Sequence, residues 1–274
     1  METISRCFLS FLIYSFLGWV CECIYCSILD KKFTNRGFLS GPLCPVYGFG
    51  ALLVIVVLNP LKDRWPLLFL GGFLLTSVVE YITSFLLEKL FHMAWWDYSN
   101  YKFNLNGRVC LLNSALFGLL TVIVVKGIAP FVDRLVSGLS PSAVQWIAFF
   151  AWCVLECDTI LSVHSVLALN GKLEMLAQIK QEIRSKSDEV RCLVRNKLTE
   201  QSKKRSDTET RLRLEIELLT ARLHSLEESA RFPTRRLIEA FPGLRSVRES
   251  EAIHRIRMAI QKKRDRLRAE RKSK

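Results

Sequence analysis

The sequence lacks the residue patterns that most soluble enzymes use for chemistry. It holds four histidines, of which His92 and His164 stand alone. It has no Ser/His arrangement, no complete zinc-ligand spacing and no Gly-x-x-x-x-Gly-Lys-Ser/Thr phosphate loop. The chain therefore has no usual motif for ATP hydrolysis, and no catalytic residue, metal ligand or cofactor is predicted.

The cysteines likewise do not form a complete set of metal-ligand motifs. Nine cysteines are present and Cys23-x-x-Cys26 has ligand-like spacing, but no second Cys or His pair follows at a suitable distance. Both lie in an apolar run, where free thiols behave as small buried hydrophobes. The run has no small-x-small cleavage site before Glu22, so we expect it to stay in the protein as a spanning helix rather than leave as a signal peptide.

Net charge is almost absent from the first 170 residues and is concentrated in the rest. Residues 171–274 contain 28 Lys and Arg against 16 Asp and Glu, an excess of +12 within the whole chain's +13. They contain few aromatics to stack on bases, so nucleic acid is not an expected partner. We predict a transmembrane helical domain over 1–170 and a cytoplasmic, basic coiled-coil tail over 171–274.

Long apolar runs fill the first domain. A spanning helix needs about 20 mainly apolar residues, and runs this long exclude barrel strands. Five stretches qualify: Phe8–Leu29, Leu43–Leu58, Leu67–Leu90, Val109–Pro130 and Ala143–Leu169. The predicted fold is all-α, a polytopic bundle of about five helices in the cell membrane, with the basic tail held in the cytoplasm. Because the second stretch is short, residues 35–50 either cross the membrane or re-enter it.

Several ionisable residues interrupt or flank these apolar runs. An ionised group within a bilayer usually faces a bundle interior or a water-filled cavity. The candidate pathway residues are the carboxylates Glu22, Glu80, Glu156 and Asp158 and the loop residues Arg36, Asp97 and Arg108. We expect one polar cluster made of Glu22, Arg36, Glu80, Asp97 and Arg108. The alternative is a set of structural ion pairs and hydrogen bonds between helices.

Helical spacing assigns some of these groups to faces. Ser77, Glu80, Ser84 and Glu88 follow one another at intervals of three, four and four residues, which places them on one face. Glu156 and Asp158 point to different sides of their helix. Arg108 is expected to pair with Asp97 or with a helix carboxylate.

Glycine and proline gather between the first two apolar runs. The backbone and hinge candidates there are Gly37, Gly41, Pro42, Pro45 and Gly48. Irregular backbone at membrane depth occurs only where protein or water satisfies its polar groups. The segment therefore predicts a re-entrant or broken start of the second helix, whose terminus would present backbone dipoles to an ion. The alternative is a tight loop followed by a glycine-packed helix.

Three groups of residues resemble a bacterial family of type IV, CmpB-like ABC-transporter permeases. They are Tyr14-Ser15-Phe16-Leu17-Gly18-Trp19-Val20-x-Glu22, Asn35-Arg36-Gly37-Phe38-Leu39-x-Gly41-Pro42-x-x-Pro45-x-Tyr47-Gly48, and Leu87-Glu88 through Trp96-Asp97-Tyr98-Ser99 and Asn104-x-Asn106-Gly107-Arg108. The resemblance covers about residues 8–165 and implies a multi-pass plasma-membrane protein. The chain departs from importer permeases in having no Glu-Ala-Ala…Gly loop, where a separate ATPase would dock.

The tail has a helical pattern with apolar heptad spacing. Its clearest seam is Leu212, Ile216, Leu219, Leu223, Leu226 and Ala230, spaced alternately by four and three residues. A local antiparallel hairpin and an intermolecular coil, hence a homo-oligomer through residues 212–230, both fit this spacing. The basic end beyond Arg255 is expected to be a solvated helix or to contact anionic lipid headgroups.

These observations favour an integral membrane protein that is a permease component for an unknown solute. Its expected partners are the lipid bilayer and a separate ATPase or cytoplasmic protein. One alternative is a membrane-anchored scaffold or sensor that recruits a partner through the coiled-coil tail. Another is an enzyme acting on a lipid-linked substrate, with the carboxylates and arginines as acid, base and anion clamp.

Overall fold

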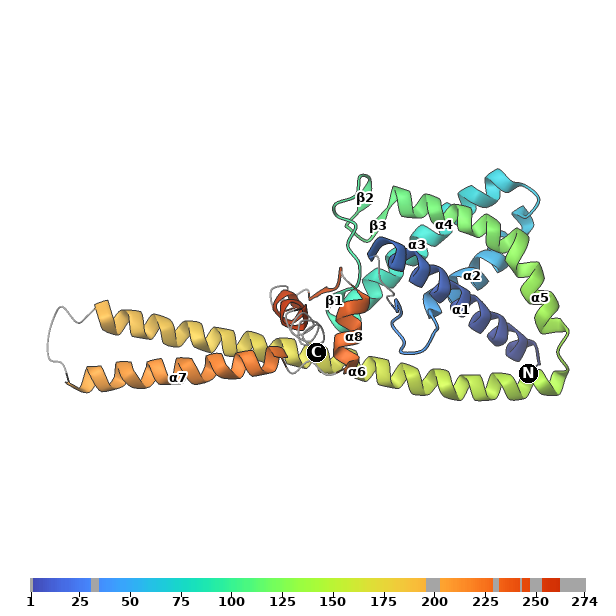
Figure 1. Ribbon diagram of the computed structural model, residues 1–274. Helices are drawn as coiled ribbons and strands as arrows, with labels where there is room; N and C mark the ends of the chain where they lie inside the picture. The colour runs from blue at the N-terminus through green and yellow to red at the C-terminus, as the bar shows by residue number, and fades with distance from the viewer. Residues whose placement is uncertain are drawn as a thin grey trace, which may run out of the picture. The chain divides into compact units, whose positions relative to one another are not determined.

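In a computed structural model the chain is almost entirely helical, which confirms the all-α fold class (Figure 1). The structure describes residues 2–30, 35–195, 203–228, 232–241, 243–246 and 253–261. The chain divides into two compact units. We call residues 1–165 with 239–244 the membrane unit, and residues 166–238 with 245–274 the tail unit.

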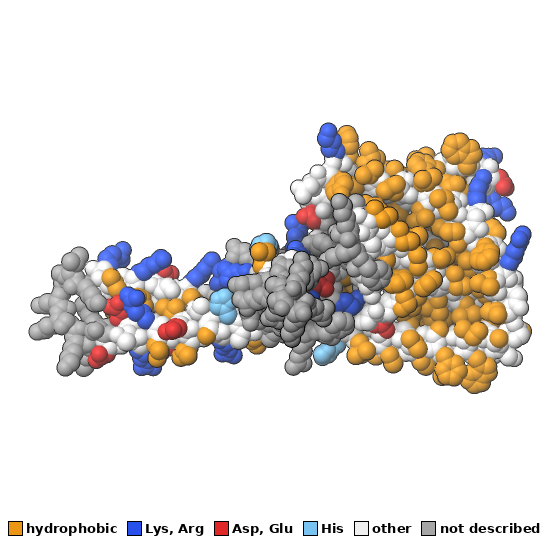
Figure 2. Space-filling model, viewed as in Figure 1, with side chains coloured by type: hydrophobic (Ala, Val, Ile, Leu, Met, Phe, Trp, Pro, Cys, Tyr) orange, Lys and Arg blue, Asp and Glu red, His pale blue; other side chains and the backbone are white. Residues whose placement is uncertain are grey.

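Four helices of the described chain are long and apolar enough to cross a bilayer. They are α1 (Glu2–Asp30), α3 (Trp65–Phe91), the continuous helix Leu111–Ser137 and α6 (Pro141–Arg195). In Figure 2 a continuous hydrophobic surface covers the membrane unit, and Lys and Arg side chains appear at its margins. Side chains such as Val56, Val154 and Phe149 point outward because lipid, not protein, is their solvent.

The second predicted stretch forms a shorter helix. Helix α2 (Pro45–Leu58) has 14 residues and continues into the 3₁₀ turn η1 (Asn59–Leu61). At 1.5 Å per residue, α2 is about 21 Å long, less than the roughly 30 Å of a hydrocarbon core. Pro45 starts the helix because its ring supplies a helical φ and its missing N–H costs nothing there.

The fourth stretch was predicted to end at Pro130, and this boundary is wrong. Helix α4 (Leu111–Ile123) passes through a π-helical turn, η2 (Val124–Ile128), into α5 (Ala129–Ser137). Proline has no N–H to donate and its ring crowds the preceding turn. The wider π turn before Pro130 lets the helix continue instead of ending.

Helix α6 has 55 residues and runs without a break from the membrane unit into the tail unit. The change of composition near Asn170 therefore lies inside one helix. A helix of this length extends about 80 Å, far more than a bilayer requires.

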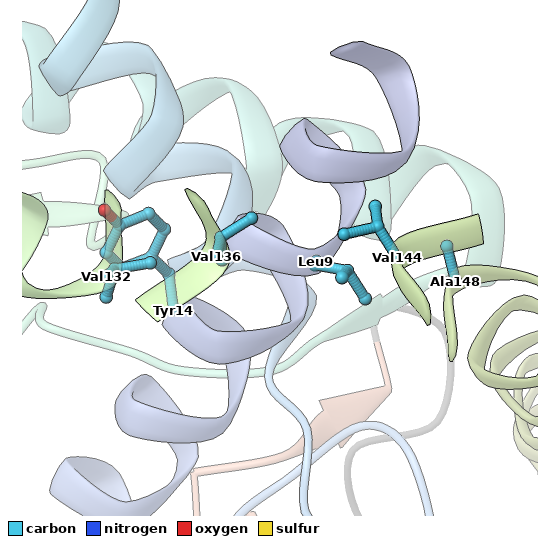
Figure 3. Packing of buried hydrophobic residues seen from close by; sticks show 6 residues of the cluster. All are labelled: Leu9, Tyr14, Val132, Val136, Val144 and Ala148. Carbon is cyan, nitrogen blue, oxygen red and sulfur yellow. The ribbon is translucent and has the colours of Figure 1, made fainter. Parts of the chain in front are cut away.

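Close helix packing in the membrane unit depends on small residues and an apolar cluster. Leu9 and Tyr14 of α1 pack with Val132 and Val136 of α5 and with Val144 and Ala148 of α6 (Figure 3). Gly48 of α2 lies against Ser15 and Phe11 of α1, where a Cβ would overlap both. Gly18 faces Tyr47 in the same way, as expected for a small residue at a helix contact.

A small β-hairpin follows α3. Strands β2 (Asn104–Leu105) and β3 (Val109–Cys110) pair antiparallel, with Leu105 opposite Val109. Asn106 and Gly107 between them have φ of +53° and +68°, the left-handed pair that tight hairpins favour. Two further two-residue strands are β1 (Met93–Ala94) and β4 (Arg245–Ser246).

In the tail unit, α7 (Lys203–Glu228) lies antiparallel beside α6, joined by the Lys186–Glu215 ion pair (Figure 1). Leu212 is buried, and the predicted seam residues Ile216, Leu219, Leu223 and Leu226 are half-buried. The local hairpin is therefore the arrangement within one chain. Helix α8 (Phe232–Ala240) as far as Ile238 and a helical segment over 253–261 also belong to this unit. Ala230 and residues 262–274 lie outside the described residues.

Candidate functional site

An ion pair between α1 and the segment before α2 forms the centre of the candidate site. Arg36 Nε lies 3.6 Å from Glu22 Oε1, and the two side chains are 21% and 26% exposed. The Tyr47 hydroxyl of α2 donates to Glu22 Oε2 at 2.6 Å. Glu22 thus joins α1 to two other segments, through one cationic and one neutral partner, and it also accepts the Cys26 thiol of its own helix. Arg36 Nε is buried and has no hydrogen-bond partner in the described structure, so the pair is incompletely satisfied.

The segment over residues 35–44 is held against α1 by contacts at intervals along that helix. The indole N–H of Trp19 donates to Asn35 Oδ1 at 2.7 Å, and the Arg36 backbone N–H donates to Cys23 Sγ at 3.3 Å. Further along, the Cys44 N–H donates to the Ser15 carbonyl at 3.0 Å. Ser15 lies midway along α1, so α2 starts at mid-bundle. These contacts fit both predictions for the segment, a broken start of the second helix and a tight loop followed by a glycine-packed helix.

Asp158 of α6 anchors the same segment from the other side. Its carboxylate accepts the backbone N–H groups of Ser40 at 2.9 Å and Gly41 at 2.7 Å, and the Ser162 hydroxyl at 3.3 Å. A Cβ at Gly41 would lie 3.1 Å from Asp158 Oδ2, so glycine permits this close approach. Asp158 therefore satisfies backbone groups that a broken helix leaves without partners.

A second set of polar side chains links α3 to α4. The Asn113 side-chain N–H₂ donates to Glu80 Oε1 at 3.2 Å and to the Tyr98 hydroxyl at 2.8 Å. Burial, with the charges of Glu80 and Glu22, raises the pKa of Tyr98 well above its usual value of 10. Tyr98 is thus a neutral hydroxyl at working pH, and it lies within electrostatic range of both carboxylates. Glu80 Oε2 is buried with no hydrogen-bond partner in the described structure.

Arg108 binds a helix carboxylate rather than Asp97. Its Nη2 donates to Glu88 Oε2 at 2.7 Å, and its guanidinium carbon lies 5.4 Å from the Tyr81 ring and 5.1 Å from the Phe85 ring. All three partners lie on α3. Arg108 reaches them because the tight β2–β3 hairpin presents it towards that helix, and Trp96 donates its indole N–H to the Arg108 carbonyl at 2.9 Å.

Asp97 shapes the loop that carries Arg108. Its Oδ1 accepts the Ser99 N–H at 3.0 Å and the Ser99 hydroxyl at 2.5 Å, a local turn motif. The Tyr98 N–H donates to the Gly107 carbonyl at 2.8 Å. Gly107 is required here, because a Cβ would lie 2.8 Å from Asp97 Oδ1 and the backbone φ is positive.

The structure brings together some of the predicted site residues and separates others. Glu22, Arg36 and Glu80 lie around Tyr47, Tyr98 and Asn113, whereas Arg108 pairs with Glu88 and Asp97 bonds within its own loop. One cluster of all five residues stays a prediction. Glu156 is exposed on α6, whereas Asp158 on the same helix is half-buried.

The predicted hinge residues all lie along the Asp158-anchored segment and the start of α2. Gly37 is buried against Trp19, Gly41 lies against Asp158, Pro42 is exposed in the turn, Pro45 opens α2 and Gly48 packs on α1. Ser77 and Glu80 contact α4, and Glu88 contacts the hairpin. Their common face on α3, predicted from spacing, is confirmed.

Sequence reasoning did not assign a role to Tyr47, Tyr98 or Asn113. Their hydroxyl and amide groups complete the contacts of Glu22 and Glu80. A signal for Asn113 existed, since an amide inside an apolar run needs a polar partner. Tyr47 and Tyr98 carried no such signal, because tyrosine is common at membrane interfaces.

A half-buried ion pair on a spanning helix, a short second helix and four long apolar helices define a polytopic α-helical membrane protein. Residues 9–163 match the family described as putative ABC-transporter type IV, and the chain belongs to that family. The match covers the membrane unit's helices and confirms the predicted family. No curated protein and no solved structure matches the chain. No group of three or more His, Cys, Asp and Glu suited to a metal occurs in the described residues.

Proposed function

We propose that the membrane unit is the permease component of a transporter and that its solute pathway passes the Glu22–Arg36 pair. The observation that carries this proposal is the position of the pair. Arg36 comes from a non-helical segment that starts α2 at mid-bundle, and its partner lies within a spanning helix. Ionised groups inside a membrane are costly and usually mark pathways for ions or solutes.

The chemistry of the site supports exchange of partners. Glu22 is shared between Arg36 and Tyr47, and Arg36 Nε, the nitrogen of the ion pair, is buried without a hydrogen bond in the described structure. A solute with a cationic group would compete with Arg36 for Glu22, and one with an anionic group would compete with Glu22 for Arg36. Glu80, Asn113 and Tyr98 would continue the polar surface beside it.

Energy for directed transport would come from a separate ATPase, because the sequence contains no phosphate loop of its own. We place the protein in the cell membrane as a multi-pass protein. The basic tail would lie in the cytoplasm, since Lys and Arg close to spanning helices are retained on that side.

Reconstitution tests the proposal. The full chain in liposomes, with and without candidate ATPases, should carry solute or ion flux that Glu22→Gln reduces at least about ten-fold, because the amide no longer pairs with Arg36. Glu156→Gln, a change to an exposed carboxylate of α6, should retain flux. Absence of flux under every gradient, or equal flux in both variants, contradicts a pathway at Glu22.

A membrane-anchored scaffold or sensor is a second candidate, favoured by the continuity of α6. One helix of 55 residues joins the membrane unit to the α6–α7 hairpin. A partner bound to this hairpin would be fixed to the membrane without any flux. Deleting residues 171–274 separates the candidates: a scaffold loses its cellular phenotype with the tail, whereas a permease loses it with Glu22→Gln or Arg36→Ala.

A further inference from the structure

Phe241 and Gly243 belong to the membrane unit although about two hundred residues separate them from Arg36. The Phe241 ring meets the Trp95 ring edge-on, with centroids 4.9 Å apart at 84°. The Arg36 guanidinium carbon lies 5.7 Å from the centre of the same ring. Phe241 therefore contacts the cation that pairs with Glu22.

Two flanking contacts fix Phe241 in this position. The Trp95 ring also contacts the Phe38 ring, with centroids 5.3 Å apart. Two aromatic rings from different segments therefore pack against Trp95. Gly243 packs closely against the backbone at Trp96, because an added Cβ would lie 3.6 Å from the Trp96 Cα. The Leu244 N–H donates to the Phe241 carbonyl at 2.9 Å and turns the chain away.

We propose that Phe241 and Gly243 form a cap that closes the Glu22–Arg36 site. This inference rests on the proposed function, because it assigns regulation to the same site. The ring covers the guanidinium through cation–π attraction, which is stronger when water is excluded.

Thiol labelling measures whether the cap is closed and requires no knowledge of the solute. Cys23 is 4% exposed and its sulfur accepts the Arg36 N–H, whereas Cys192 is exposed in the tail. The full chain in nanodiscs is treated with a charged methanethiosulfonate reagent, and each cysteine is quantified by peptide mass spectrometry. Phe241→Ala should raise the labelling rate of Cys23 about ten-fold, since it loses both a ring pair and a cation–π contact. Phe241→Tyr should stay close to the wild type.

Two other cysteines distinguish opening of the cap from general unfolding. Cys110 is 3% exposed in β3 and should stay unlabelled, and Cys192 should label at its wild-type rate. Leu218→Ala, which trims a tail side chain that is 63% exposed, should leave Cys23 protected. An unchanged Cys23 rate in Phe241→Ala overturns the cap, as does a rise at Cys23 matched by Cys110.

Flux measured on the same variants distinguishes failure of the cap from failure of the permease proposal. If Phe241→Ala exposes Cys23 but neither protein carries flux, the cap stands and permeation fails. If the wild type carries flux and Phe241→Ala alters neither labelling nor flux, the cap fails alone.

Discussion

The two arginines of the candidate site region in the membrane unit are turned inward, whereas most described arginines of the tail unit face outward. Arg36 and Arg108 are 21% and 17% exposed and pair with carboxylates on spanning helices. Arg191 and Arg211, on α6 and α7 of the tail, are 83% and 80% exposed. Apolar residues follow the opposite rule: Val56 is 74% exposed and Leu176 of the tail is 4% exposed.

This contrast teaches how the solvent decides which contacts stabilise each unit. In lipid, apolar side chains gain nothing by meeting one another, so small residues and polar contacts hold helices together. In water, burial of apolar area is the main stabilising term, and exposed ion pairs contribute little. The four predictions below test the contrast, beginning with the largest expected effect.

A bulky residue at Gly48 should disrupt the membrane unit most. In Gly48→Leu the side chain would overlap Ser15 and Phe11 of α1, so α2 cannot approach. We expect a loss above about 3 kcal/mol and a fall in melting temperature of roughly 6–12 °C in detergent. Gly50→Leu is the matched control on the same helix, because no atom lies within 4 Å of an added Cβ there. Equal melting temperatures would show that close α1–α2 packing is not required.

Removal of the Asp158 carboxylate should be next in size. Asp158→Ala leaves the Ser40 and Gly41 N–H groups without their acceptor, and we expect destabilisation of about 2–3 kcal/mol. Hydrogen exchange of residues 38–44 in nanodiscs should accelerate accordingly. Glu156→Ala, two residues away on the exposed side of α6, should leave exchange unchanged. Similar protection in both variants would mean that Asp158 does not hold the segment.

Apolar truncation should separate the two faces of α7. Leu212 is 8% exposed and Leu218 is 63% exposed. Leu212→Ala should destabilise the α6–α7 hairpin by about 2 kcal/mol, and Leu218→Ala by less than about 0.5 kcal/mol. Hydrogen exchange of α7 peptides in the full chain measures both. A larger effect for Leu218 would place an unseen partner on the outer face of the hairpin, such as a second copy of the chain.

The smallest effect should come from the Lys186–Glu215 pair and should depend on pH. Lys186 lowers the pKa of Glu215 by donating a hydrogen bond to it, and Glu215 raises the pKa of Lys186 in return. The carboxylate's contribution is present above its unfolded pKa near 4.5 and is lost as pH falls through the lower folded pKa. The ammonium's contribution is present below 10.5 and is lost as pH rises through the higher folded pKa.

The hairpin should therefore be most stable between these limits. The distance distribution between spin labels on α6 and α7 should broaden at acid pH in the wild type. In Glu215→Gln it should be insensitive to acid, because the titrating group is gone. An acid transition that persists in the variant would assign the pH dependence to other carboxylates.

The spacing of the sequence was sufficient for much of this fold. Apolar runs located the spanning helices, and a period of three and four residues placed Ser77, Glu80 and Glu88 on one face of α3. The heptads placed Leu212 and its neighbours on one apolar seam but left open whether its partner is the same chain or another copy. These features are local, because a helix's period and its solvent determine which side chains face inward.

The partners of the charged residues could not be read in the same way. Arg108 binds Glu88 and not Asp97, because a two-residue left-handed turn aims it at α3. The continuation of the fourth helix past Pro130 depends on a π turn that no spacing rule indicates. Each outcome depends on a few backbone angles.

By itself the sequence determined the class of protein, its helices and the separation of apolar from basic segments, since these follow from composition and period. Only the tertiary structure decided which groups meet. Asp158 reaches the Ser40 and Gly41 amides, Tyr47 reaches Glu22, and Phe241 reaches Arg36 across most of the chain. The physical reason is that hydrogen bonds and ion pairs form over about 3–4 Å, a precision that arises from helix packing and loop closure.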